Sequence, residues 1–282
     1  MNQRRGRVPS RAAEPLPVNQ NCEITLEIGG MPILLHLQDT SFRQLLALRY
    51  AGFVGSASPP KFEFDIELTA PLADDPDEEV CVQMRNGVWQ LRRGDFRADW
   101  DPRAGRGHIR QSANPYSIDS VLRIVHTLIL APAGGFLLHS AAAIRNGRAF
   151  LFSGVSGAGK TTISRLAPPD VTLLTDEVSY IRRDQEGYHA CGTPFAGELA
   201  RVGENCSAPI DCLFFLEHGP ENRLEPLAKS EATRRLMRNV LFFADDSDLV
   251  RSVFESACEF VDRIPIQRLT FVPDSRAWSM IQ

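Results

Sequence analysis

Hydrophobic and polar residues alternate along much of the first third of the chain, which is the pattern of half-buried β-strands. The alternation is clear in three runs, residues 24–28, 33–37 and 62–68. Asn86-Gly87 lies between two further apolar runs, and an Asn-Gly pair favours a tight hairpin turn. Residues 21–113 are therefore expected to form a mostly β N-terminal domain with one short helix after Asp39. No catalytic group of residues is recognisable in this domain, and both a recognition module and a structural lid remain open.

After residue 114 the apolar residues recur at helical as well as strand spacing. Helices are expected at 117–130, 231–245 and 248–263, and a last strand at 267–272. A second Asn-Gly pair, Asn146-Gly147, predicts another hairpin, whose return strand ends at Ser153. The segment 114–282 is thus predicted to be a second domain that mixes helices and strands.

The segment that follows this hairpin carries the strongest motif of the sequence. It reads F-L-F-S-G-V-S-G-A-G-K-T from Phe150 to Thr161, which places G-x-x-x-x-G-K-[ST] between an apolar strand and a helix. Glycines let successive backbone N–H groups turn toward an anion, and the start of a helix adds partial positive charge. Lys160 is expected to reach the β- and γ-phosphates of ATP, and the Thr161 hydroxyl to ligate Mg²⁺. An ordinary glycine-rich turn before a helix is the alternative.

The predicted nucleotide-binding residues of this loop share the ability to surround a phosphate chain with backbone or side-chain donors. They are Gly154, Ser156, Gly157, Ala158, Gly159, Lys160, Thr161 and Thr162.

Two acidic residues follow the loop after a short interval. Pro168-Pro169 must end the helix that begins at Lys160, and V-T-L-L-T is then a strand that ends at Asp176-Glu177. Phosphoryl transfer needs an oriented attacking oxygen, and Asp176 suits a general base that accepts the proton of a substrate hydroxyl. A solvated strand end is the alternative explanation of the acidic pair.

The order of these motifs resembles the HPr kinase/phosphorylase group, a phosphotransferase fold related to ATP-dependent phosphoenolpyruvate carboxykinase. The resembling stretch covers about residues 135–200 and contains L-L-H-S-A-A-A-I, G-V-S-G-A-G-K-T, L-L-T-D-E-V-S-Y-I and G-T-P-F-A-G-E. The resemblance implies an α/β fold, in which an HPr-kinase/PEP-carboxykinase-like P-loop domain follows the smaller β domain. The most similar members are stand-alone HPr-kinase-related serine kinases, which phosphorylate a hydroxyl on a peptide.

The resemblance also implies roles for single residues. Asp176 would be the catalytic acid group, His139 would lie beside it, and Glu177 would help Thr161 to hold Mg²⁺. His139 would then orient Asp176 and tune its pKa, whereas a histidine in so apolar a stretch is otherwise typical of a buried core. Glu177 stands where the family has a second Asp, and the family's R-G-L-G-I segment is not found. Phosphorolysis, hexamer assembly and HPr as the substrate are therefore not carried over from that group to this chain.

The glycine-flanked loop G-T-P-F-A-G-E ends at Glu198. Glu198 is a candidate to lie near Mg²⁺ or the substrate, and Arg201 is a candidate to meet phosphate charge. A purely structural turn explains this loop equally well.

Composition and charge narrow the class of protein. The chain has 282 residues, 43% of them hydrophobic and 23% charged, which is typical of a globular protein. Its net charge of −4 implies no general affinity for nucleic acid. The most apolar helix candidate, 121–130, is too short to span a membrane. Six scattered cysteines and the lack of a secretory signal favour a cytoplasmic protein. Residues 1–20 are expected to be a disordered tail, and a homo-oligomer is one option for the assembly.

Taken together, the motifs predict an ATP- and Mg²⁺-dependent kinase that transfers the γ-phosphate to a Ser or Thr hydroxyl of a peptide or protein. Two alternatives remain open: a kinase of a small hydroxylated metabolite, and a nucleotide-binding regulatory module with little turnover. The joint presence of Lys160, Thr161 and Asp176 favours an enzyme over the regulatory module.

Overall fold

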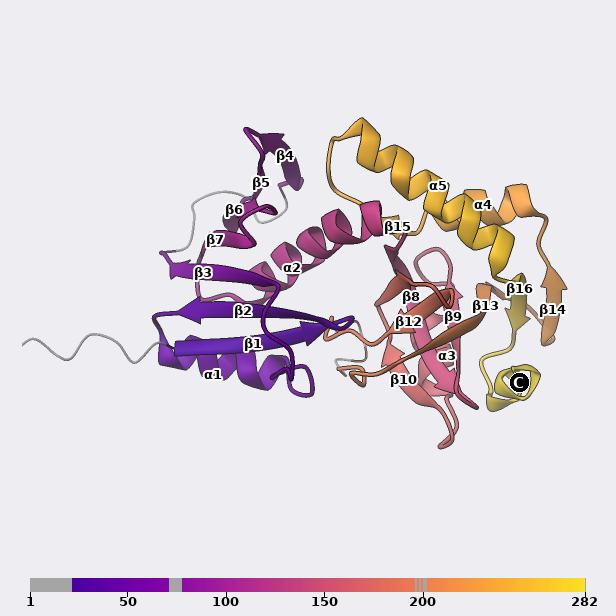
Figure 1. Ribbon diagram of the computed structural model, residues 1–282. Coiled ribbons are helices and arrows are strands. Elements are labelled where there is room, and N and C mark those ends of the chain that lie inside the picture. Colours follow the sequence, from indigo (N-terminus) through magenta and orange to yellow (C-terminus); the bar gives the residue numbers. More distant parts are fainter. Residues whose placement is uncertain (1–21, 71–77, 196, 198, 200–201, 282) are drawn as a thin grey trace, which may run out of the picture.

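The computed structural model describes residues 22–70, 78–195, 197, 199 and 202–281, so the predicted tail lies outside the described residues. A first sheet at the N-terminal side and a barrel at the C-terminal side are joined by a long helix (Figure 1). The helices are α1 (Thr40–Arg49), α2 (Pro115–Leu130), α3 (Lys160–Arg165), α4 (Lys229–Met237) and α5 (Ser247–Arg263), with 3-10 turns η1 (Ala131–Ala133) and η2 (Ser275–Met280).

The first sheet has seven strands in the order β1-β2-β3-β7-β6-β5-β4. They are β1 (Cys22–Ile28), β2 (Met31–Leu37), β3 (Phe62–Leu68), β4 (Cys81–Arg85), β5 (Val88–Arg93), β6 (Phe96–Asp101) and β7 (Arg106–Gln111). Alternate side chains of these strands are buried, as the sequence pattern predicted. The hairpin between β4 and β5 turns at Asn86-Gly87, where both residues have positive φ, so this turn is confirmed.

Helices α1 and α2 close the core of this sheet. Asp39 caps α1 by accepting the Phe42 amide at 2.7 Å, and Asn114 with Pro115 starts α2. Arg49 and Tyr50 at the end of α1 both donate to the buried carboxylate of Asp119 in α2, which fixes the two helices to each other. One hydrophobic cluster contains the inner face of the sheet, both helices and part of the barrel, including Leu137 and Tyr180.

His126 of α2 is fully buried in this cluster. Neither ring nitrogen has a hydrogen-bond partner among the described residues, and the ring packs edge-on against Tyr180 at 5.3 Å. Burial lowers the pKa of His126 from 6.5 to about 4, because the charged imidazolium loses its hydration. The folded protein therefore holds this side chain neutral at pH values where the unfolded chain already binds a proton.

We expect the wild-type protein to lose about 3 kcal/mol of unfolding free energy through His126 as the pH falls from 6.5 to 4. The sign follows from the lowered pKa: in this interval the unfolded state binds more protons, so acid favours unfolding. Urea unfolding of wild type and of His126→Leu at several pH values would measure the difference between the two curves. Parallel curves across this interval would contradict the prediction.

The second sheet closes on itself. Its strands are β8 (Phe136–Arg145), β9 (Arg148–Ser153), β10 (Thr172–Thr175), β11 (Val178–Arg183), β12 (Tyr188–Cys191), β13 (Ser207–His218), β14 (Arg223–Pro226), β15 (Val240–Leu241) and β16 (Ile266–Phe271). Successive pairings run β8-β11-β12-β13-β9 and return to β8, which makes a closed five-stranded barrel. β9 is parallel to β13, and β13 is parallel to β16, whereas the other barrel pairs are antiparallel.

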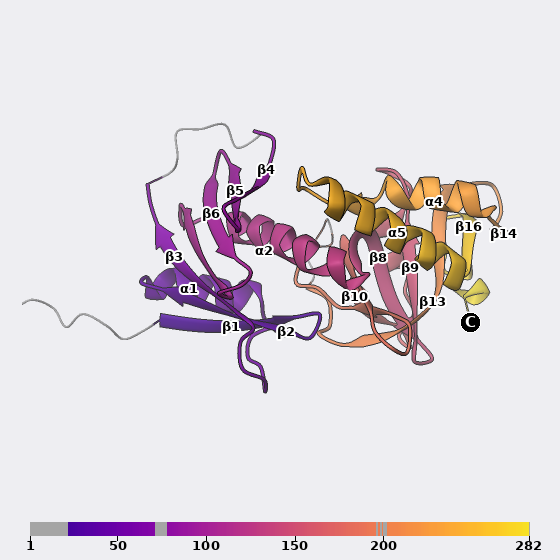
Figure 2. The ribbon, with the colours of Figure 1, turned by 45° about the horizontal axis from the view of Figure 1, so that its top comes forward.

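Helices cover both faces of these strands. α4 and α5 lie along one side of the barrel (Figure 2), where Phe260 meets Phe136 and Tyr188 edge-on. α3 and η2 cover the opposite face, and the indole N–H of Trp278 donates to the Ile163 carbonyl at 2.9 Å. The predicted helix 231–245 is shorter than expected, because α4 ends at Met237 and β15 then pairs with β8.

The predicted fold class is wrong. The sequence predicted an α/β P-loop domain of the HPr-kinase/PEP-carboxykinase type, but the structure is mostly β, with 40% strand and 27% helix among the residues that it describes. The motif itself has the expected strand–loop–helix flanks, since β9 leads into the loop and α3 follows. The physical reason for the error is that α3 has only six residues and covers one patch of a closed, largely antiparallel sheet.

Within the part of the chain that the structure describes, no helix combines the length and apolar character needed to cross a bilayer.

Candidate functional site

The candidate site lies where strand β8 changes its partners. Up to His139, β8 pairs with β11 and β15; from Ser140 it pairs with β9, and from Ala142 also with β10. Three segments therefore leave the sheet around His139: the loop after Ser153, the turn at Asp176-Glu177, and the chain before β15. Backbone hydrogen bonds tie two of them to β8, from His139 N to Asn239 O at 2.7 Å and from Ser140 N to Glu177 O at 3.1 Å.

A cavity of about 490 Å³ opens at this divergence, which we call the first cavity. Its lining residues come from β8, from the loop and α3, from the acidic turn, and from the segment that packs on that turn. They are His139, Ser156, Gly157, Gly159, Lys160, Thr161, Thr162, Asp176, Glu177 and Gly197. The sequence predicted all of these except Gly197, and the fold brings them together from segments far apart in the chain.

Glycine is required at two points of the loop. Gly157 and Gly159 have φ of +78° and +106°, a region that other residues rarely adopt. A Cβ on Gly159 would lie 2.6 Å from the ring of Phe271, so the loop packs directly on the end of β16. His218, at the end of β13, supports the loop from the same side, with its Nε2 2.8 Å from the Gly157 carbonyl oxygen. The loop is thus held in shape by the ends of two parallel strands.

Lys160 is only 8% exposed, and its ammonium donates to the Gly154 carbonyl at 3.3 Å. This contact folds the side chain back over the start of the loop, so the ammonium lies at the cavity rather than in solvent. Because α3 has only six residues, its dipole adds less than the sequence analysis assumed. The cationic side chain that this cavity receives is therefore that of Lys160.

Asp176 is 5% exposed, and both of its carboxylate oxygens accept backbone N–H groups. Oδ1 accepts from Gly197 and Oδ2 from Leu199, each at 2.9 Å. Thr175 holds the turn, since its hydroxyl oxygen accepts the amides of Glu177 and Val178 at 3.2 Å. The approach of Gly197 is close: a Cβ there would lie 2.8 Å from Glu177 Oε2 and 3.0 Å from Asp176 Oδ2.

The carboxylate beside the His139 imidazole is that of Glu177, with Nδ1 and Oε1 3.8 Å apart. The resemblance to the HPr kinase/phosphorylase group implies that His139 acts on Asp176, whereas the structure pairs it with Glu177. Burial and the nearby Lys160 ammonium lower the pKa of His139, and Glu177 only partly opposes them. The imidazole is therefore held neutral at neutral pH, and its Nδ1 faces the Glu177 carboxylate from beyond hydrogen-bond distance.

Comparison with known protein families shows to which family the chain belongs. Residues 110–282 match the family model described as SynChlorMet cassette protein ScmC. The chain belongs to the ScmC family. The matched region begins within β7, and it contains α2, the whole barrel and the first cavity. No curated protein matches the sequence.

Membership in the ScmC family corrects the resemblance to the HPr kinase/phosphorylase group, which identified the wrong family. The error has a physical origin. A glycine-rich phosphate loop and an acidic strand end are short sequence motifs that bind anions and metal ions. Such motifs occur on many unrelated folds.

Not every residue predicted for the site lines the first cavity of this ScmC-family chain. Gly154 lines a neighbouring cavity, and Ala158 is buried beneath the loop, where a Cβ on Gly154 would meet it at 2.7 Å. Glu198 and Arg201 lie outside the described residues. Gly197 and His218 contribute to the site although no motif predicted them there. The spacing of G-T-P-F-A-G-E gave a signal for Gly197, but no local motif marks His218.

The donor atoms at the first cavity fit a magnesium ion. Thr161 and Glu177 offer hard oxygen ligands, which Mg²⁺ prefers. The described residues contain no group of three or more His, Cys, Asp or Glu side chains placed to hold a metal by themselves. An ion here would therefore take part of its shell from phosphate oxygens and water, as Mg²⁺ commonly does in phosphoryl-transfer sites.

Proposed function

We propose that this ScmC-family chain is an ATP- and Mg²⁺-dependent phosphotransferase that transfers the γ-phosphate to a Ser or Thr hydroxyl of a peptide or protein. The observation that carries the proposal is the shared cavity of Lys160, Thr161 and Asp176, which combines a cationic phosphate loop with a buried carboxylate. Its volume of about 490 Å³ lies in the range of small-molecule sites.

In the proposed reaction, the amides of the loop and the Lys160 ammonium bind the phosphate oxygens and offset their negative charge. The acceptor hydroxyl oxygen attacks the γ-phosphorus, and a new P–O bond forms as the bond to the bridging oxygen of ADP breaks. ADP leaves with that electron pair, and the hydroxyl proton passes to Asp176. Each oxygen of Asp176 accepts one N–H, so each keeps a lone pair for this proton.

Glu177 and Thr161 are the residues that would hold Mg²⁺, which supplies charge neutralisation at the β- and γ-phosphates when it is bound. His139 then acts as a positioning residue for Glu177, since its neutral ring faces that carboxylate.

The test is incubation of the full chain with ATP, Mg²⁺ and mixtures of Ser- and Thr-containing peptides. ADP release would be followed by a coupled assay and the added phosphate by mass spectrometry. We expect release of ADP that depends on both Mg²⁺ and acceptor. Binding of ATP without acceptor-stimulated ADP release, over a broad set of acceptors, would instead favour a regulatory nucleotide-binding module.

A further inference from the structure

We propose that a second cavity beside the first binds the acceptor molecule, and that Arg238 with Arg234 receives a carboxylate or phosphate group of that acceptor. This inference rests on the proposed function, because it gives the acceptor hydroxyl its route to the γ-phosphate. It deepens that function by naming the chemical class of the acceptor: a hydroxyl compound that carries an anionic group.

The second cavity has a volume of about 580 Å³ and meets the first one at His139 and Ser156, which line both. Its other lining residues come from the start of the phosphate loop, the end of β13, helix α4 and the two residues that follow this helix. They are Gly154, Val155, Phe215, Leu216, Glu217, Glu231, Arg234, Arg235, Arg238 and Asn239.

The position of Lys160 indicates which end of a nucleotide would face this second cavity. In a loop of this pattern the lysine reaches the β- and γ-phosphates. The Lys160 ammonium lies 3.3 Å from the carbonyl oxygen of Gly154, which itself lines the second cavity. The terminal phosphate would therefore lie at the junction, and a molecule in the second cavity would present its hydroxyl there.

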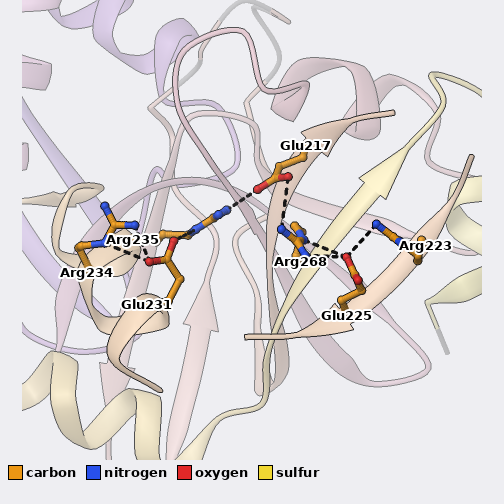
Figure 3. Close-up of polar contacts among 7 residues, drawn as sticks. All are labelled: Glu217, Arg223, Glu225, Glu231, Arg234, Arg235 and Arg268. Carbon is orange, nitrogen blue, oxygen red and sulfur yellow. Dashed lines mark hydrogen bonds and ion pairs between the residues drawn. The ribbon is translucent and has the colours of Figure 1, made fainter. Parts of the chain in front are cut away.

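An alternating network of arginines and glutamates fixes one wall of the second cavity (Figure 3). Glu231 binds both Arg234 and Arg235, the latter at 2.7 Å, within one turn of α4. Arg235 also binds Glu217 of β13 at 2.7 Å. Glu217 continues to Arg268, and Arg268 to Glu225. Helix α4 is thus tied to the barrel, and Arg235 makes the link because it binds Glu231 and Glu217 at the same time.

Arg238, the residue directly after α4, is outside this network. It is exposed, and among the described residues no hydrogen bond or ion pair is made by its guanidinium. Arg234 has a single carboxylate partner, and 53% of its side chain is exposed. The wall therefore presents cationic groups with free donors, and an arginine binds a carboxylate or phosphate through two parallel hydrogen bonds.

The same lining argues against a nucleotide base in this cavity. Its aromatic residue from β13, Phe215, is only 1% exposed, and the Arg235 guanidinium lies 5.9 Å above the ring. A base would find no open aromatic face there. Val155, by contrast, is 74% exposed at the tip of the loop and gives an apolar contact for the body of an acceptor.

The acceptor is tested with three probes, because an anionic hydroxyl compound can be a peptide or a small molecule. The probes are the acidic peptide acetyl-Glu-Glu-Ser-Glu-Glu-amide, its neutral counterpart with Gln in place of Glu, and the hydroxy acid malate. Each is titrated calorimetrically into the full chain, once with a saturating non-hydrolysable ATP analogue and Mg²⁺ and once without nucleotide. We expect an acidic probe to bind wild type. The Arg238→Ala substitution should raise the dissociation constant of that probe about 10-fold or more.

The matched control is Arg251→Ala, which removes an arginine of α5 whose side chain is 68% exposed and so changes the net charge equally. It should leave probe binding unchanged, and Arg238→Lys should restore part of it. Binding of malate alone would indicate a small-molecule acceptor, and binding of the acidic peptide alone a peptide acceptor; either supports the inference.

Three results would overturn the inference: no acidic probe binds, Arg238→Ala binds as wild type does, or Arg238→Ala weakens the ATP analogue instead of the probes. The last result would place the nucleoside in the second cavity. Failure of the proposed function would give a different result. The ATP analogue would then either not bind wild type or bind the Lys160→Ala variant equally well.

Discussion

The Lys160→Ala variant is expected to lose about 100- to 1000-fold in ATP turnover. The reason is the position of the ammonium: it is buried at the first cavity and folded over the loop, where it would bind the oxygens of the β- and γ-phosphates. A neutral methyl group cannot offset the charge that develops on those oxygens during transfer. The measurement is the steady-state rate of ADP release at saturating Mg²⁺, with the acceptor that stimulates wild type best.

The control for this variant is Lys229→Ala, which removes a lysine whose side chain is 73% exposed at the start of α4. It should keep wild-type turnover, which separates the local effect from a change of net charge. Thermal unfolding of both variants would show that the barrel remains folded. Wild-type turnover by a folded Lys160→Ala protein would mean that the loop does not act on a nucleotide.

The Asp176→Asn variant is expected to lose about 100- to 10,000-fold in kcat, because an amide cannot accept the proton of the attacking hydroxyl at neutral pH. The substitution has a second, local effect. One carboxylate oxygen becomes an NH₂ group that faces the amide of Gly197 or Leu199, so one of the two hydrogen bonds to this segment is lost. Single-turnover measurements at saturating ATP and Mg²⁺ would isolate the chemical step.

Glu177→Gln serves as the matched comparison, since it alters the neighbouring carboxylate of the same turn. It should raise the Mg²⁺ concentration needed for half-maximal rate more than it lowers kcat, whereas Asp176→Asn should do the reverse. If Asp176→Asn loosened the chain around Gly197 but turned over at the wild-type rate, Asp176 would be a structural anchor and not the base.

Gly197 illustrates how far a local motif can guide the description of a site. The sequence marked its loop as glycine-flanked, but it gave no reason to bring that loop against Asp176. The reason is steric and appears only in the fold: the backbone passes so close to both acidic side chains that a Cβ would meet them at 3.0 Å or less. The same holds for His218, whose contact with the loop depends on β13 lying parallel to β9.

The ion-pair network of Figure 3 also depends partly on neighbouring residues in the sequence and partly on the tertiary structure. Helical spacing of Glu231, Arg234 and Arg235 follows from the sequence, since residues three and four apart share a helix face. The ion pair between Arg235 and Glu217 does not follow from the sequence, because Glu217 is on a strand that reaches α4 only when the barrel closes. Arg238 becomes notable only because that network leaves it out.

What the sequence alone determined is local. The turns at Asn86-Gly87 and Asn146-Gly147, the alternation of the first sheet, the ends of α3 and the shape of the glycine-rich loop after Ser153 follow from residues next to one another in the chain. Those conformations depend on backbone freedom and on the period of apolar residues, which nearby positions encode.

The fold class, the family and the composition of the two cavities were decided by the tertiary structure and by comparison of the whole domain. The barrel closes because β9 pairs with β13, and β8 exchanges partners at His139 so that three segments diverge there. Strand pairing between distant segments is selected by the packing of both faces together, and no short stretch of sequence carries that information.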